Sequence, residues 1–233
     1  MNFESLTPIR RAILLILKRE GPATMARLAS EIKITKEAVR QQLAMLHQEG
    51  WVKKDLLKEK KVRSGRPTVR YTLTPVGDHV FPKAYDELAV EILETLGQTL
   101  GTDAMRQLLS NLTETRVKKW QGLLEGKTLA EKLKALKGLY LAKDPFTSVS
   151  KAPDGFRLVE GNCPFLNVAS QQPALCSVTV STLTQLLGVK VVREERFQSG
   201  HGRCVFHVHK NTPIKPGTLK FQLEPELPKA SLG

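Results

Sequence analysis

The feature that most constrains the fold is a succession of three short amphipathic segments at the start of the chain, each with its own helix signals. The first segment begins at Pro8 and is followed by Gly21, and its apolar residues recur at helical spacing. A second short helix is expected over 23–32. Thr35 is a suitable N-cap for a third helix. The pattern therefore predicts three helices in close succession.

The three expected helices are followed by two expected strands joined by a basic loop. Val69, Tyr71 and Leu73 alternate with polar residues, which indicates a strand with one buried face. The loop before this strand contains the sequence Ser-Gly-Arg-Pro at 64–67. Two strands and a loop after three helices are typical of a winged helix-turn-helix, which we expect to occupy residues 1–80.

Side chains that suit DNA contact lie early in the third helix and in the basic loop. A recognition helix enters the major groove with its N-terminal residues, where arginine matches guanine and glutamine matches adenine. The narrow loop would bring Arg66 towards a minor groove or a phosphate. A solvated charged face is the alternative explanation. The residues expected at double-stranded DNA are Lys36, Arg40 and Gln41 of the helix and Lys61, Arg63 and Arg66 of the loop.

The charge of the chain is concentrated in the same region. The formal net charge is +13, and residues 1–80 hold 16 lysines and arginines against 8 acidic residues, a surplus of 8. Such a surplus favours polyanions because neutralised phosphates release counterions, although an anionic membrane attracts the same charge. Charge alone therefore leaves both partners open.

The run from Arg10 to Ala89, with its SGRPTVRYTLT segment, resembles bacterial winged-helix regulators of the ArsR/DeoR-like type. The resemblance covers about residues 8–90. It implies that Thr35, Lys36, Arg40 and Gln41 face DNA bases and that the Gly-Arg-Pro segment forms the tip of the wing.

The middle of the chain, 81–144, is expected to be helical. Leu88, Ile92, Leu96 and Leu100 recur at helical spacing, and further amphipathic helix is expected over 103–142, with breaks near Gly122 and Gly126. These apolar residues can pack within their own chain or against a second copy. We favour a homodimer because a two-fold dimer of winged helices reads two half-sites.

The region 145–233 is expected to be a small α+β sensor domain. A strand over 156–161 and a helix over 176–188 are followed by strands over 189–197 and 203–209, and a short strand is expected over 218–224. The overall prediction is an α+β protein with an N-terminal winged helix-turn-helix, central dimerisation helices and this C-terminal domain.

All three cysteines of the chain, Cys163, Cys176 and Cys204, lie in this C-terminal region. Reduced cysteine commonly packs as a small buried apolar residue, whereas several thiols in one region favour a shared soft-metal site. The residues leave these two alternatives open. The spacing Cys-x12-Cys-x27-Cys lacks the short Cys-x2-Cys pair of structural zinc sites, so zinc is the less favoured metal.

The motifs NCP, PALC, LLG and SGHGRCVFHV are similar to the C-terminal region of SufR-type repressors, iron–sulfur regulators of cluster-assembly genes. Together with the N-terminal resemblance, this similarity covers most of the chain. It implies an iron–sulfur cluster bound by Cys163, Cys176 and Cys204, with [4Fe–4S] favoured over [2Fe–2S]. Some relatives have a further cysteine between the last two, and the stretch 189–197 has none.

The fourth cluster ligand is therefore open. Strand alternation places His207 and His209 on the face opposite Cys204, so His201, in the preceding turn, is the preferred candidate. A solvent-exposed turn histidine, an exogenous ligand and a residue of a partner chain are equally compatible with the sequence.

No secretory signal or membrane-spanning stretch is recognised, and an odd number of cysteines argues against a disulfide framework. We therefore expect a cytoplasmic regulator with reduced thiols and no membrane partner. Two rivals remain: a winged-helix protein that senses zinc or a small molecule, and a thiol or metal enzyme fused to a DNA-binding domain. Nucleophile–base and phosphate-loop motifs are lacking in the sequence, so we expect no enzymatic activity.

Overall fold

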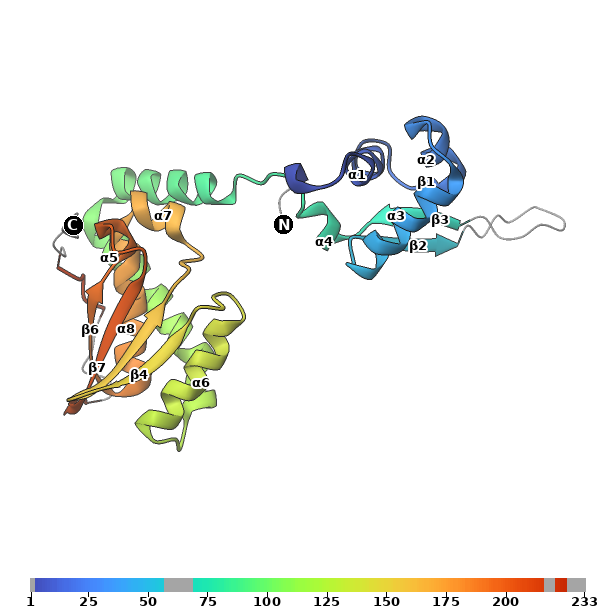
Figure 1. Ribbon diagram of the computed structural model, residues 1–233. Coiled ribbons are helices and arrows are strands. Elements are labelled where there is room, and N and C mark those ends of the chain that lie inside the picture. The colour runs from blue at the N-terminus through green and yellow to red at the C-terminus, as the bar shows by residue number, and fades with distance from the viewer. Residues whose placement is uncertain (1–2, 57–68, 216–220, 226–233) are drawn as a thin grey trace. The chain divides into compact units, whose positions relative to one another are not determined.

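The structure, a computed structural model, describes residues 3–56, 69–215 and 221–225. The chain forms two compact units, Met1–Ala84 and Tyr85–Gly233 (Figure 1). The first unit combines helices with a small three-stranded sheet, and the second combines helices with a four-stranded sheet. The predicted α+β class with an N-terminal winged helix-turn-helix is confirmed.

The first unit consists of short helices around a core of aliphatic side chains. The antiparallel strands β2 (Val52–Leu56) and β3 (Val69–Leu73) form the body of its sheet, and β1 (Ala23–Thr24) pairs with the other edge of β3. The helical elements are η1 (Phe3–Ser5), α1 (Pro8–Glu20), α2 (Met25–Ile32), α3 (Lys36–Gln48) and α4 (Pro75–Asp78).

The predicted third helix is confirmed together with its cap. The Thr35 side chain accepts a hydrogen bond from the backbone N–H of Ala38 at 3.2 Å, which satisfies one of the free donors at the helix start. Val39, Leu43 and Leu46 are buried in the core of the unit. The opposite side of α3 is therefore left exposed, with its orientation fixed by this packing.

The second unit begins with a long helical segment. α5 (Tyr85–Leu124) is interrupted at Gly101, whose φ of 79° lies in the left-handed region that favours glycine. α6 (Leu129–Leu141) starts at Thr128, which forms a capping box with Glu131. The expected break near Gly122 and Gly126 is confirmed, because α5 ends at Leu124 and Gly126 lies in the turn between the two helices.

The sheet of the second unit is antiparallel, with the order β4-β5-β7-β6. Leucines of α5, α6 and α8 share one core with its strands, so these helices cover one face (Figure 1). Its elements are β4 (Ser148–Ala152), β5 (Gly155–Glu160), α7 (Leu166–Gln171), η2 (Pro173–Leu175), α8 (Cys176–Leu187), β6 (Val189–Glu195), η3 (Phe197–Ser199) and β7 (Cys204–Pro213).

Two features of this unit differ from the sequence expectation. β4 was not predicted, because its residues are mostly polar and it lies at the edge of the sheet. The strand expected over 218–224 is wrong for the part that the structure describes, since 221–225 forms no strand. Instead, Phe221 is buried against Leu109 and Val178.

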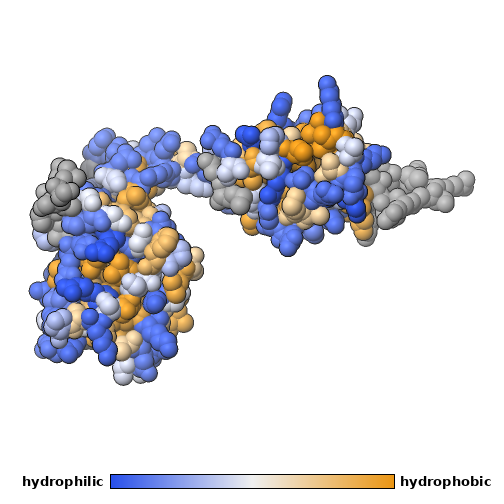
Figure 2. Space-filling model, in the orientation of Figure 1, coloured by the Kyte–Doolittle hydropathy of each residue, from blue (hydrophilic) through white to orange (hydrophobic). Residues whose placement is uncertain are grey.

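Apolar side chains remain at the surface among hydrophilic ones (Figure 2). Over the described ranges, no helix is long and apolar enough to cross a membrane.

Candidate DNA interface and cysteine-lined cavity

The exposed side of α3 carries the residues predicted to contact DNA. Thr35, Lys36, Arg40 and Gln41 are all exposed. Arg40 donates two hydrogen bonds to the Glu37 carboxylate, at 2.8 and 2.7 Å, and this pairing lowers the pKa of Glu37. Glu37 thus holds the Arg40 guanidinium on the open face of the helix.

The wing residues predicted to contact DNA lie outside the residues that the structure describes. These are Lys61, Arg63 and Arg66. The strands on either side of this loop are paired from Val52↔Leu73 to Leu56↔Val69. The described strands are therefore those of a wing.

The three cysteines converge on one cavity in the second unit. Cys163 follows β5 in a loop, Cys176 is the first residue of α8, and Cys204 is the first residue of β7. All three line a cavity of about 230 Å³. Cys204 is buried, and the other two cysteines are half-buried. Residues that are as far as 41 positions apart in the sequence thus form one site.

Burial dominates the chemistry of the three thiols. It raises the pKa of Cys163, Cys176 and Cys204 above the ordinary value, while the positive charge of Arg193 acts to lower the pKa of the last two. The Gln198 side-chain amide donates a hydrogen bond to Sγ of Cys176 at 3.2 Å. The thiols are therefore protonated at neutral pH until a metal displaces the protons.

The cavity also contains buried charged groups. Arg193 donates from Nε to Glu224 at 2.9 Å and from Nη2 to the backbone carbonyl of Cys176 at 2.9 Å. Burial raises the pKa of Glu160 to about 7, with smaller opposing effects of Arg193 and Arg116. The lining therefore has fixed positive charge beside a carboxyl group that is readily neutralised.

The predicted fourth ligand, His201, does not line this cavity. Its Nδ1 atom lies 3.2 Å from the backbone carbonyl oxygen of Arg196. Sequence reasoning did not identify several residues that do line the cavity, because their neighbours come from distant elements. These residues are Arg116, Tyr140, Glu160, Arg193 and Gln198.

Comparison with known proteins bears on the first unit. Residues 6–53 match the family model described as winged helix-turn-helix DNA-binding. No curated protein sequence matches the chain significantly. The first unit is a winged helix-turn-helix DNA-binding domain, and the protein is therefore a DNA-binding protein of the class to which many transcriptional regulators belong.

Solved structures of bacterial regulators are similar to parts of the chain. The MarR family regulator NMB1585 from Neisseria meningitidis is 20% identical over 53% of this chain and 83% of its own, with a TM-score of 0.28. The zinc-responsive MarR family member ZitR from Lactococcus lactis is 27% identical over 48% of this chain and 76% of its own, with a TM-score of 0.28. PadR from Bacillus subtilis, in complex with operator DNA, is 17% identical over 78% of this chain and 98% of its own, with a TM-score of 0.27.

Proposed function

We propose that this protein is a transcriptional repressor that binds an operator in double-stranded DNA and senses iron or redox state through an iron–sulfur cluster. Cys163, Cys176 and Cys204 would hold the cluster, with [4Fe–4S] favoured over [2Fe–2S]. The observation that carries the proposal is that all cysteines of the chain line one cavity in the second unit.

The residues of the cavity fit such a group. Thiolates are the usual ligands of iron–sulfur clusters, and three cysteines line this one cavity. Thiolate ligands give a cluster net negative charge, which the nearby guanidinium groups of Arg116 and Arg193 would offset. A bound cluster would supply ligation energy that depends on iron supply and oxidants, and this energy could bias a conformational equilibrium of the protein.

The two candidates for the fourth cluster ligand, His201 and an exogenous ligand, differ in the movement that they require of the protein. His201 lies beside Arg196 rather than in the lining of the cavity, so its ligation would require the turn before β7 to move. An exogenous ligand would need no such movement. A cluster that is held by three protein ligands and not four would have one more reactive iron, which suits a sensor.

We further infer that the protein acts as a homodimer through the first part of α5. Tyr85, Leu88, Ile92 and Leu100 are each at least half exposed, although they recur at helical spacing. A stripe of this kind is suited to pairing with a second copy. Two copies would present two α3 helices to two half-sites.

The proposed targets, genes of iron–sulfur cluster assembly, rest on the resemblance of the cysteine-containing motifs to SufR-type repressors. The direct test is to select DNA from a randomised pool with anaerobically prepared, cluster-loaded protein. The affinity for the selected DNA is then measured by fluorescence anisotropy before and after chelation of the iron. The proposal predicts at least a tenfold change in Kd, about 1.4 kcal/mol. An unchanged Kd would leave a DNA-binding protein without this sensor function.

A further inference from the structure

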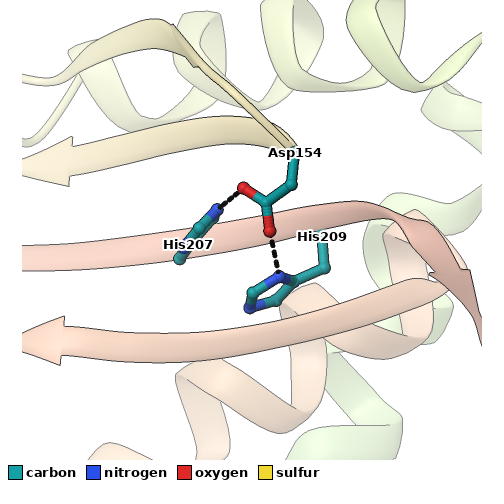
Figure 3. A group of neighbouring side chains, drawn as sticks. All are labelled: Asp154, His207 and His209. Atoms are coloured by element: carbon teal, nitrogen blue, oxygen red, sulfur yellow. Dashed lines mark hydrogen bonds and ion pairs between the residues drawn. The ribbon is translucent and has the colours of Figure 1, made fainter.

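A second group of potential metal ligands lies away from the cysteines. Asp154, His207 and His209 approach one another closely (Figure 3). One Asp154 oxygen is 2.7 Å from Nε2 of His207, and the other is 2.8 Å from Nδ1 of His209. The two imidazole rings are stacked, with centroids 4.1 Å apart. One carboxylate therefore lies between two imidazoles.

The fold positions these three residues securely. Asp154 lies in the turn between β4 and β5, and its backbone carbonyl accepts a hydrogen bond from the N–H of Lys210 at 3.0 Å. The next residue, Gly155, is paired with His209, and a Cβ atom there would lie 1.9 Å from the carbonyl oxygen of Val208. The close approach of the turn to β7 therefore depends on this glycine.

The group lies on the open face of the sheet. Side chains alternate along β7, so His207 and His209 point away from the buried Cys204, Phe206 and Val208. His207 and His209 are only partly buried. Metal ions in solution can therefore reach the group without passing through the cavity.

A second carboxylate orients His207. Nδ1 of His207 lies 2.9 Å from Glu194, and Arg157 holds the same carboxylate with bonds of 2.7 and 3.2 Å. Both ring nitrogens thus face carboxylates, and both contacts are hydrogen bonds only when both nitrogens carry protons. With Nδ1–H donating to Glu194, a metal ion can take the place of the proton on Nε2. A carboxylate behind a metal-bound histidine is a common second layer around zinc.

We propose that Asp154, His207 and His209 bind a divalent transition-metal ion such as Zn²⁺. The ligand atoms are one Asp154 oxygen, Nε2 of His207 and Nδ1 of His209, all within 4.8 Å of one another. Ligands at about 2.0–2.1 Å in a tetrahedral zinc site lie about 3.4 Å apart, so modest side-chain rotation brings the three ligand atoms to that spacing. Water fills the fourth position. The ion ties the β4–β5 turn to β7, and its nitrogen and oxygen ligands separate it chemically from the thiol site.

The test uses the full-length chain with Cys163, Cys176 and Cys204 replaced by serine, titrated with Zn²⁺ by calorimetry. One ion per chain is expected. His207→Ala and His209→Ala are each expected to weaken binding at least tenfold, and Glu194→Gln is expected to weaken it 10- to 100-fold. His79→Ala, an exposed histidine of the first unit, is the matched control and leaves binding unchanged.

A second measurement keeps the test independent of cysteine replacement. Co²⁺ added to the unaltered chain gives visible bands from the nitrogen–oxygen site that disappear in His209→Ala, whereas thiolate-bound cobalt adds an intense near-ultraviolet band. No zinc binding by the folded cysteine-free chain, or binding unchanged in both histidine variants, would overturn the proposal. Neither result depends on whether the cysteines hold a cluster.

Discussion

Arg193 and Glu224 form a buried ion pair that joins β6 to the C-terminal tail, with 2.9 Å between Nε and a carboxylate oxygen. The two side chains are only 3% and 9% exposed. The same guanidinium stacks on Phe206 and donates to the backbone carbonyl of Cys176. The tail thereby contributes to the charge and the position of groups around the cysteine cavity.

Removal of one side chain of this ion pair should lower the free energy of unfolding. Glu224→Ala leaves the Arg193 charge buried without its carboxylate, and we expect a loss of about 3–5 kcal/mol of unfolding free energy in urea denaturation. Glu195→Ala, which breaks the exposed pair with Arg203, is the control and should cost less than about 1 kcal/mol. Equally small losses of unfolding free energy in the two variants would show that the pairing of the tail with Arg193 contributes little to stability.

Arg40 should determine sequence preference in DNA binding. Arg40→Ala removes a side chain that can contact a base edge, and we expect a loss of about 1–3 kcal/mol on selected DNA, with much less on random DNA. Fluorescence anisotropy at fixed salt measures both affinities. Arg203→Ala removes the same charge from the second unit and should leave both affinities nearly unchanged. A uniform loss on both DNAs would instead assign Arg40 to phosphate contact.

The exposed stripe of α5 should mediate dimer formation. The double variant Leu88→Lys/Ile92→Lys places two charges on residues that are 53% and 50% exposed, and we expect a monomer in sedimentation equilibrium. Both positions are exposed within one chain, so the folded monomer should keep its far-ultraviolet circular dichroism. Leu123→Lys, at 51% exposure on the same helix, should leave the dimer intact. A dimer that survives the double variant would place the interface elsewhere.

Glu160 should make the stability of the metal-free protein depend on pH. Its pKa is raised from 4.5 to about 7 by burial, so the folded protein holds a proton that the unfolded chain has lost. Stability should therefore fall as the pH rises from about 4.5 to 7, by at most about 3 kcal/mol. Glu160→Gln should flatten this dependence and stabilise the protein at pH 8. Urea denaturation at pH 5 and pH 8 measures both effects, and an unchanged slope in the variant would contradict this role.

Local signals predicted the first unit well. Pro8, Thr35 and the apolar spacing of α1 and α3 act over a few residues, so helix bounds can be read directly from the sequence. Gly101 was less predictable, since its left-handed conformation interrupts a helix whose sequence on both sides remains helical. The edge strand β4 is stabilised by pairing with β5, which the sequence of β4 does not show.

The two candidate sites of the second unit depend, more than the helices of the first unit do, on contacts between residues that are distant in the sequence. The confinement of the cysteines to one region predicted a shared site, and the structure brings all three to one cavity. The pairing of Arg193 with Glu224 could not be predicted, because it joins a strand to a tail 31 residues away. His207 and His209 were considered only as ligands for the cysteine site. The sequence His-x-His on a strand does signal a shared face, but its third member, Asp154, becomes a neighbour only through the β4–β5 turn.

The most direct test of the proposed function is the iron and acid-labile sulfide content of the protein after anaerobic reconstitution, with the triple Cys→Ser variant as the control. We predict about four iron and four sulfide per chain, with broad visible absorbance, and neither element in the folded triple variant. Wild-type protein that stays colourless and free of iron, or a triple variant that retains as much iron and sulfide as the wild type, would contradict it.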